Sequence, residues 1–135
     1  MNNPIIVRDC AGDDLRRFER LLESVFGEPG WSPAVDISET DGELIVSAAL
    51  PGVSKDEVAL EVKDGRLILS GQLKNGDKKE EVWLRRELPQ GPFRRSFELP
   101  AEIDASRASA ALRDGILELR LPKAERAKPQ KIAIN

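Results

Sequence analysis

The sequence contains no histidine and only one cysteine, Cys10. The absence of histidine removes the most common general base, a common metal ligand and the usual partner of a nucleophilic serine or cysteine. A single cysteine cannot form an internal disulfide, which fits a reducing compartment. The aspartates fall mainly at turns and strand ends, without the spacing of a catalytic pair. We therefore expect no enzyme, no metal site and no cofactor, and we interpret Cys10 as an incidental thiol.

Long apolar runs and a basic excess are also missing. The chain has 21 basic and 24 acidic residues, a net charge of −3, which argues against a nucleic-acid partner. No run approaches the roughly 18 apolar residues of a membrane span, and residues 1–8 lack the basic start and the apolar length of a signal peptide. At 135 residues, we expect one cytoplasmic domain with short extensions and no membrane span.

The most strongly patterned stretch is residues 110–122. Asp114-Gly115 separates two apolar runs, and this dipeptide favours a type I′ hairpin turn with positive φ at both positions. After the turn, every second residue is a leucine: Leu117, Leu119 and Leu121. That period predicts a strand with one buried face. Because Pro122 has no N–H to donate, we expect the domain to end at about residue 122.

The rest of the chain from Trp31 also has the pattern of short strands. We expect strands near residues 34–37, 44–50, 58–62, 67–69 and 93–99. Turn signals such as Pro51-Gly52 separate them, and Gly71 is expected to close the fourth strand. Several short strands with regular turn signals predict an all-β fold, a β-sandwich over residues 31–122. Residues 1–30 are then an N-terminal arm, and residues 123–135 are an extended C-terminal tail.

One amphipathic helix is expected in the arm, at residues 13–26. Its apolar residues follow helical spacing and are Leu15, Phe18, Leu21, Leu22, Val25 and Phe26. The helix either packs on its own domain or forms a mobile apolar arm that contacts partners. We favour the arm, because it lies outside the β-region and a Pro/Gly break at residues 27–30 separates it.

Residues 73–91 interrupt the strand pattern with a strongly charged segment. Inside it lies a small apolar island, Val82-Trp83-Leu84. Loops longer than about 12 residues are usually functional or mobile. The pattern fits a solvated hairpin folded back on its own sheet and fits equally a short strand on a neighbouring subunit.

Arg95 is a charge on an apolar face. It shares its side of the predicted strand with Phe93, Phe97 and Leu99. An unpaired charge in such a place is costly. Arg95 is either an inward charge on an edge strand that discourages wrong pairing or half of an ion pair across a subunit contact, which we favour.

Five short motifs now stand in order. They are Leu50-Pro51-Gly52-Val53, Leu67-Ile68-Leu69-Ser70-Gly71, Gly91-Pro92-Phe93 with Phe97 and Leu99-Pro100, Ala110 with Asp114-Gly115-Ile116-Leu117, and Ile132-Ala133-Ile134. Each is weak alone, but in this order and spacing they resemble the α-crystallin domain of small heat-shock proteins, in its bacterial and plant subtype. The likeness runs from about residue 31 to residue 134.

The resemblance implies an immunoglobulin-like antiparallel sandwich. It also implies an ATP-independent holdase of the stress response, which binds partly unfolded client proteins and assembles as homodimers into larger homo-oligomers. By position, Arg95 matches the family's arginine at the dimer interface. The segment Val82-Trp83-Leu84 matches the strand that dimer partners exchange, which favours the neighbouring-subunit interpretation.

The tail supplies a second contact. Ile132 and Ile134 are two residues apart and point the same way in an extended strand, so they suit addition to a sheet edge. The expected groove lies between alternating residues of two strands: Val58, Leu60 and Val62 on one, and Ala108, Ala110 and Leu112 on the other. From Pro122 to Ile132 the tail spans about 33 Å when fully extended, enough to reach a neighbouring subunit.

Client binding needs exposed apolar surface, and the six apolar residues of the arm are the first candidates. The groove is the second candidate, when the tail leaves it. The main rival is a monomeric β-sandwich docking module, such as a co-chaperone of the CS type, which needs no Ile-x-Ile tail. Measuring the mass of the assembly separates the two.

Overall fold

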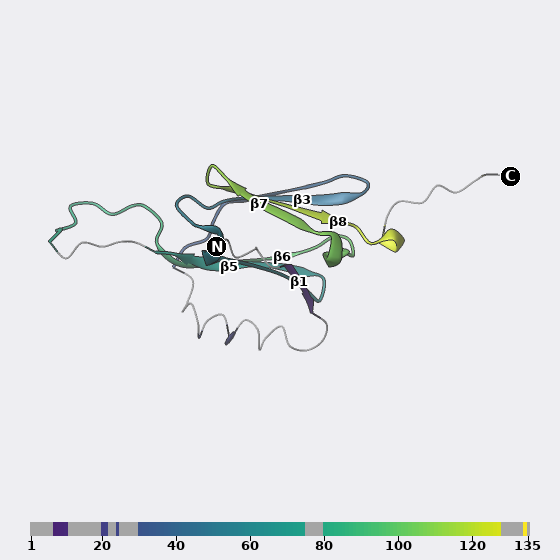
Figure 1. Cartoon of the computed structure of the whole chain (residues 1–135), viewed down its shortest axis with the longest axis horizontal. Coiled ribbons are helices and arrows are strands. Elements are labelled where there is room, and N and C mark those ends of the chain that lie inside the picture. Colours follow the sequence, from purple (N-terminus) through teal and green to yellow (C-terminus); the bar gives the residue numbers. More distant parts are fainter. Residues whose placement is uncertain are drawn as a thin grey trace.

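Two four-stranded β-sheets lie face to face in the computed structural model, which describes residues 7–10, 20–21, 24, 30–74, 80–127 and 134 (Figure 1). The first sheet has the order β1-β4-β5-β6 and the second the order β2-β3-β8-β7. The strands are β1 (Val7–Cys10), β2 (Val35–Glu39), β3 (Glu43–Ala49), β4 (Val58–Lys63), β5 (Arg66–Leu73), β6 (Gly91–Glu98), β7 (Ser109–Arg113) and β8 (Ile116–Pro122). Short 3₁₀ turns are η1 (Lys55–Glu57), η2 (Ala105–Arg107) and η3 (Glu125–Ala127). The all-β sandwich predicted from the sequence is confirmed.

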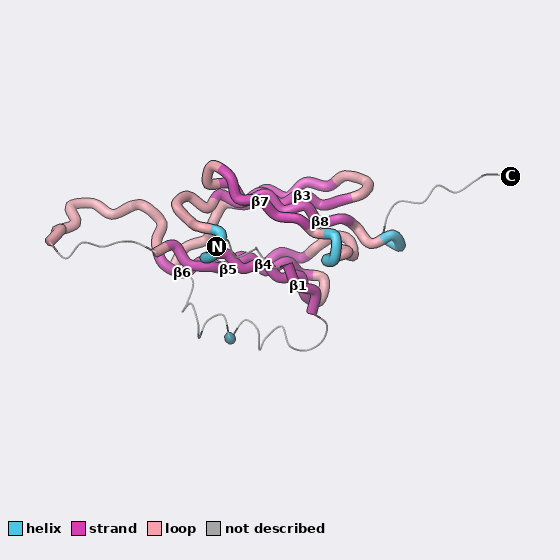
Figure 2. The backbone as a smooth tube through the Cα atoms, viewed as in Figure 1, coloured by secondary structure: helices cyan, strands magenta, loops and turns pink. Residues whose placement is uncertain are grey.

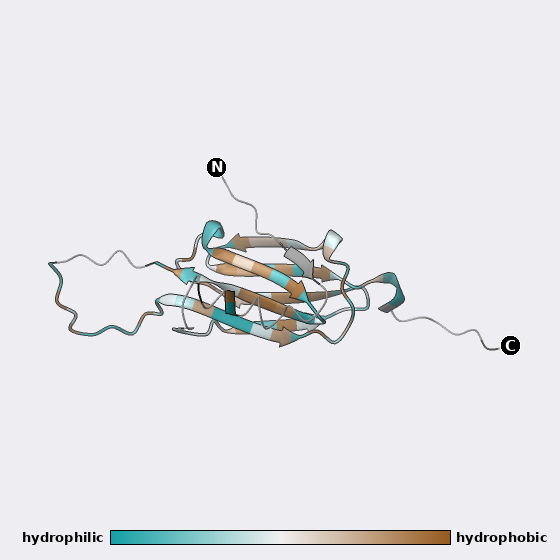
Figure 3. Ribbon diagram, turned by 90° about the horizontal axis from the view of Figure 1, so that it is seen from below, coloured by the Kyte–Doolittle hydropathy of each residue, from teal (hydrophilic) through white to brown (hydrophobic). Residues whose placement is uncertain are grey.

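The core forms where the alternating faces of the two sheets meet. In the second sheet, alternate residues of β3 pair with the leucines of β8: Leu44 with Leu121, Val46 with Leu119 and Ala48 with Leu117. All six are at most 3 % exposed. Hydrophobic residues accordingly lie mainly along the strands (Figure 3). The period of two in the sequence thus predicted which side chains are buried.

The predicted hairpin turns are present. Asp114 and Gly115 have φ values of 53° and 77°, as a type I′ turn requires, and Asp64 and Gly65 repeat this with 50° and 73°. Gly52 has a φ of 78°, as expected for the turn that follows Pro51. These local signals were sufficient because they depend on only two adjacent residues.

Gly71 does not close the strand that contains it, contrary to the expectation from the sequence. It lies within β5, which continues to Leu73 and pairs Gly71 with both Val58 and Phe93. A Cβ atom at this position would lie 2.6 Å from Cζ of Phe93 and would overlap the carbonyl oxygen of Glu57. The glycine is there because backbone and ring approach closely, and not because the chain turns.

Pro122 lies near the end of the hydrogen-bonded sandwich. It is the last residue of β8, and its carbonyl oxygen accepts a hydrogen bond from the N–H of Asp104. The next two residues still bond to the sandwich, through Lys123 N to Gly42 O and Ala124 N to Glu102 O, each 2.9 Å. Proline is tolerated because it stands at the strand end, where a missing N–H breaks no central pairing.

The arm contributes a strand that the sequence analysis did not predict. β1 pairs in parallel with β4, and its register joins Val7 to Leu60 and Cys10 to Lys63. The first sheet therefore includes residues 7–10 of the segment that the sequence analysis assigned to the arm. Of the helix expected at residues 13–26, only Arg20, Leu21 and Ser24 are described, with helical backbone; the rest lies outside the described residues.

Candidate interaction surfaces

Arg95 lies on β6, the outer strand of the first sheet, with its side chain on the inner face beside Leu69 in register. Its Nη1 donates a hydrogen bond to the carbonyl oxygen of Pro33, 3.2 Å away, and its Cζ lies 4.8 Å from the ring centroid of Phe97. A carbonyl oxygen and an aromatic face both favour a cation. Within the described part of the chain Arg95 has no ion pair, so an ion pair across a subunit contact stays a hypothesis.

Trp31 anchors the segment that brings Pro33 to Arg95. Its backbone forms a bridge with Phe93, and its Nε1 donates to the carbonyl oxygen of Gly91 at 3.1 Å. The two aromatic ring centroids are 5.1 Å apart, with planes tilted by 56°. Residues 31–34 therefore cross from β6 to the start of β2. The sequence analysis did not identify Trp31 as an anchor. The feature that could have indicated this role is a large aromatic residue within a stretch rich in proline and glycine.

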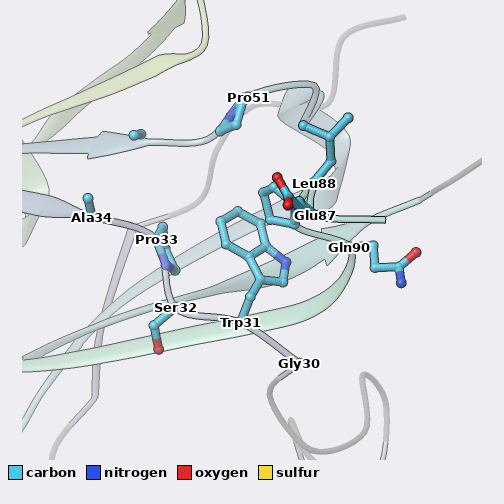
Figure 4. A pocket seen from close by; sticks show the side chains of 11 residues that line it. Gly30, Trp31, Ser32, Pro33, Ala34, Pro51, Glu87, Leu88 and Gln90 are labelled. Atoms are coloured by element: carbon cyan, nitrogen blue, oxygen red, sulfur yellow. The ribbon is translucent and has the colours of Figure 1, made fainter. Parts of the chain in front are cut away.

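An open pocket of about 560 Å³ lies beside this tryptophan. Figure 4 shows the Trp31 indole with Pro33 on one side and Glu87 and Leu88 on the other. Its lining comes from residues 30–34, from Ala49 and Pro51, and from residues 87–90. The pocket thus joins the segment before β2 to the base of the long loop. Leu88, which is 84 % exposed, is an apolar residue of this surface that the sequence analysis missed.

The loop between β5 and β6 extends away from both sheets (Figure 2). Its described residues 80–90 contain no strand, and the apolar island is open to solvent, with Val82 85 %, Trp83 51 % and Leu84 97 % exposed. The guanidinium carbon of Arg86 lies 4.3 Å from the Trp83 ring centroid. The described residues of this segment therefore do not fold back on their own sheet, and pairing with a neighbouring subunit stays a prediction.

β2 forms the outer edge of the second sheet. In the described part of the chain it pairs only with β3, and its residues 36–39 are exposed. Ile37 presents an apolar side chain there. A sheet edge of this kind offers backbone N–H and C=O groups to another strand. The structure thus contains both an unpaired edge and an exposed apolar segment.

The six groove residues predicted from the sequence belong to one hydrophobic cluster. Val58, Leu60 and Val62 are buried, at most 8 % exposed, while the β7 side is partly buried and packs against the same cluster: Ala108, Ala110 and Leu112. β7 is the outer strand of its sheet, but the outer edge of β4 is paired with β1. The residues that form both walls of the predicted groove therefore lie in one cluster, and the outer edge of β4 is already paired with β1.

The tail and arm residues are described in part. Ile134 is 98 % exposed, whereas Ile132 lies outside the described residues. In the arm, Leu21 is an exposed apolar residue. The other arm candidates lie outside the described residues: Leu15, Phe18, Leu22, Val25 and Phe26.

Asp104 orders the turn that leads into β7. Its side chain accepts a hydrogen bond from the backbone N–H of Ser106, at 3.1 Å, and pairs with Nε of Arg107 at 2.8 Å. Hydrogen bonds from the Ser106 and Arg107 side chains lower the pKa of the Asp104 carboxyl, with a further contribution from the Arg107 charge. On the second sheet, a hydrogen bond to Glu118 raises the pKa of Arg120 most, and the negative charge of Glu43 raises it further.

Among the residues that the structure describes, no cluster of three or more histidine, cysteine or acidic side chains is arranged to hold a metal ion. In the same residues, no helix is both long enough and apolar enough to cross a membrane.

Comparison with known proteins gives consistent results. The model of the Hsp20/alpha crystallin family matches residues 36–135. Heat shock protein 16 of Schizosaccharomyces pombe is 34 % identical over 133 residues, which cover 95 % of this chain and 90 % of that protein. An 18.3 kDa class I heat shock protein of Oxybasis rubra is 39 % identical over 75 % of this chain and 64 % of its own length. The crystal structure of hspA from Xanthomonas axonopodis has a TM-score of 0.64 and 36 % identity, and the likeness covers 73 % of this chain and 98 % of that one.

Proposed function

The chain belongs to the Hsp20/alpha crystallin family of small heat-shock proteins, and from this we propose that it is an ATP-independent holdase. In this proposal it binds partly unfolded proteins, prevents their aggregation and assembles from homodimers into larger homo-oligomers. It acts without catalysis, cofactor, nucleic acid or membrane span, and it works in the cytoplasm. The observation that carries the proposal is the exposed apolar island of the long loop, because a solvated apolar segment on an extended loop needs a partner.

The partner of the island is a second copy of the chain. The loop extends away from its own sandwich (Figure 1). β2 lies at the end of the second sheet, and among the described residues it pairs only with β3. If Val82-Trp83-Leu84 adds to the β2 edge of the other subunit, both the exposed side chains and the exposed backbone groups are satisfied. Arg95 lies close to this contact, since its partner Pro33 leads directly into β2.

Larger assemblies form through the tail. Ile132 and Ile134 dock between β4 and β7 of a neighbouring subunit, and the small side chains of Ala108 and Ala110 leave room for them. Two buried isoleucines give a gross gain of roughly 3–6 kcal/mol, much of which is offset by ordering the tail. One such contact is weak and reversible, whereas many within one assembly act together through their effective concentration.

Clients bind to the apolar residues of the arm. Unfolded proteins share little beyond exposed apolar segments, so the binding surface must itself be apolar. Leu21 is already exposed to solvent. The groove between β4 and β7 is a second client surface when the tail is absent.

The experiment is an aggregation assay without ATP, run beside light scattering and with and without heat. A heat-sensitive enzyme serves as client. We expect protection by the wild-type chain and a mass well above that of a monomer. The rival, a monomeric docking module of the CS type, predicts a monomer and little protection.

The arm is tested by one variant and a matched control. The variant replaces the six apolar arm residues by serine: Leu15, Phe18, Leu21, Leu22, Val25 and Phe26. The control replaces three polar residues of the same segment by serine: Arg17, Arg20 and Glu23. We expect loss of protection only in the first. Equal protection by both variants would refute the arm as the client site and leave the holdase activity standing.

A further inference from the structure

The pocket beside Trp31 adjoins the sheet edge that the proposed function assigns to a second subunit. Its lining includes Ala34, the residue directly before β2, whose carbonyl oxygen accepts a hydrogen bond from the N–H of Ala49 at 3.0 Å. The pocket volume of about 560 Å³ lies within the range of roughly 300–1,000 Å³ that holds small molecules. One large side chain of a strand added to β2 therefore has room to enter.

The walls of the pocket suit an aromatic ring. They comprise the indole of Trp31, the exposed side chain of Leu88 and three proline rings: Pro33, Pro51 and Pro89 (Figure 4). The indole is held in place, because its Nε1 donates a hydrogen bond to a backbone carbonyl oxygen of β6. A fixed indole among flat apolar rings favours an aromatic occupant, which gains both apolar burial and ring contacts.

The alternation along β2 decides which side chain of the exchanged strand faces the pocket. Ile37 pairs with the buried Val46 and lies on the inner face of the sheet, whereas Ala34, three positions earlier, lies on the outer side. The first and last residues of the exposed island Val82-Trp83-Leu84 extend the apolar inner face when the island adds beside Ile37. Its central tryptophan then projects to the opposite side, where Ala34 lines the pocket.

Charge favours the same occupant. The guanidinium carbon of Arg86 lies 4.3 Å from the Trp83 ring centroid, so a positive charge accompanies the indole. The pocket lining includes Glu87, whose side chain is 72 % exposed although it pairs with Arg85 at 3.0 Å. Insertion of the tryptophan with its arginine therefore brings a cation towards a carboxylate. Trp83 of the same chain is not one of the described residues that line the pocket.

We propose that the pocket beside Trp31 receives the partner's Trp83, and that this insertion sets the register of the exchanged strand. A strand shifted by one residue turns its side chains to the wrong face, so a tryptophan that fits at one place along β2 selects one register. The inference rests on the proposed addition of residues 82–84 to the β2 edge. Because each chain carries both the pocket and the tryptophan, a symmetric dimer contains the insertion twice.

The first test measures dimer dissociation constants by sedimentation. The full-length parent carries Ile132→Gly and Ile134→Gly, which remove the proposed contacts between dimers. Ala34→Phe fills the pocket from an exposed position, and Trp83→Ala removes the inserted ring. The matched control is Ala111→Phe, at an exposed position on β7, the opposite edge strand of the same sheet. We expect each of the first two changes to weaken the dimer roughly 30-fold, as for a buried aromatic anchor, and the control to leave it unchanged.

Combining the two changes shows whether they act at one contact. If Trp83 acts through the pocket, the protein with both Ala34→Phe and Trp83→Ala should dimerise no more weakly than either single variant. Additive losses would mean that the tryptophan and the pocket act separately, and they would overturn the inference. Unfolding curves show whether each variant is folded. If Ala34→Phe does not fold, Leu88→Ala replaces it, since it removes one wall of the pocket at an exposed position and should also weaken the dimer.

Acrylamide quenching of tryptophan fluorescence gives a second readout. The chain has only two tryptophans, Trp31 and Trp83, so subtracting the signal of the Trp83→Phe protein leaves that of Trp83. We expect Trp83 to be shielded in the dimeric parent and accessible in Ala34→Phe at concentrations where both proteins are dimers. Equal quenching of Trp83 in the two dimers would contradict the insertion.

The outcomes separate the inference from the function on which it rests. A parent that stays monomeric at every concentration would refute the proposed dimer, and the inference would fall with it. If the parent dimerises and Ala34→Phe leaves its dissociation constant unchanged, the dimer stands and only the insertion is refuted. Equal weakening by Ala34→Phe and Ala111→Phe would likewise refute the insertion alone.

Discussion

Arg95 on β6 donates a hydrogen bond to the carbonyl oxygen of Pro33, 3.2 Å away, although 62 positions separate the two residues in the chain. Pro33 belongs to the segment that leads into β2, the outer strand of the other sheet. The bond therefore links the segments that form the outer edges of both sheets. β6 directly follows the long loop, and β2 is the open edge. We assign both the loop and this edge to the dimer contact.

Replacing Arg95 by alanine should destabilise the single domain even before any subunit contact is considered. Hydrogen bonds made by charged groups contribute about 1.5–3 kcal/mol, and because Arg95 is only half-buried we expect a loss of about 1–2 kcal/mol in the free energy of unfolding. Urea unfolding at high dilution measures it. The control is Arg113→Ala, at an exposed position on β7, which should change little. Equal effects of the two substitutions would contradict this role.

Gly71→Ala should be strongly destabilising, because its Cβ would lie 2.6 Å from Phe93 Cζ and against the backbone oxygen of Glu57. Overpacking of a core costs roughly 1–3 kcal/mol, and a clash with backbone is hard to relieve. Gly42→Ala is the matched control, since a Cβ there meets nothing within 4 Å. Thermal unfolding should show a clear drop in Tm for the first and little change for the second. A Gly71→Ala protein as stable as wild type would contradict the close approach.

The ionisation of Asp104 should make the stability of the fold depend on pH in the acid range. Ser106 and Arg107 lower the pKa of its carboxyl below the ordinary value, so the charged form stabilises the fold. This stabilisation is complete above the unfolded pKa of about 3.9 and is lost as the pH falls through the lower, folded pKa. Asp104→Asn keeps an acceptor for the Ser106 N–H but loses the charge. We therefore expect it to be less stable than wild type at pH 6, with the difference vanishing towards about pH 2.

The measurement is urea unfolding of both proteins at several pH values. Asp41→Asn, at an exposed turn position, serves as the control for loss of one negative charge. A stability difference at Asp104 that is constant across the acid range would show that the carboxylate charge is not what orders η2.

Local patterns in the sequence predicted the sandwich well. The alternation of Leu117, Leu119 and Leu121 and the turn at Asp114-Gly115 each depend on a few adjacent residues, and both are seen in the structure. Gly71 was misinterpreted because a glycine in a strand and a glycine after a strand look alike in sequence. What distinguishes them is the ring of Phe93 on the next strand, which no local window contains.

The interaction surfaces were less predictable for the same physical reason. Val82, Trp83 and Leu84 were identified as an island, yet their exposure depends on where the whole loop goes. The Pro33 partner of Arg95 and the pairing of β1 with β4 are contacts between distant segments. β1 is also only four residues long, too short to show the period of a strand.

The island should be necessary for dimer formation. Val82→Ser, Trp83→Ser and Leu84→Ser together remove the apolar side chains that the proposed exchange buries, so the protein should dissociate towards monomers. Sedimentation over a range of concentrations measures this, while an unchanged unfolding midpoint at high dilution would show that the sandwich itself is intact. Ile116→Ser is the control, because it removes an exposed apolar side chain on β8 outside the loop. A variant with all three serines that remains a dimer would rule out the exchange.

The tail should hold dimers together in the larger assembly. Ile132→Gly with Ile134→Gly removes both side chains that the proposed groove receives, and no other contact in the proposal replaces them. Because each tail contact is weak, the assembly depends on many of them, and losing all at once should reduce the mass to that of the dimer. Light scattering measures this mass. Ala133→Gly is the matched control, since it adds the same backbone freedom between the two isoleucines and leaves both in place. An unchanged mass in the double variant, or an equal loss in the control, would show that the isoleucine side chains do not hold the assembly.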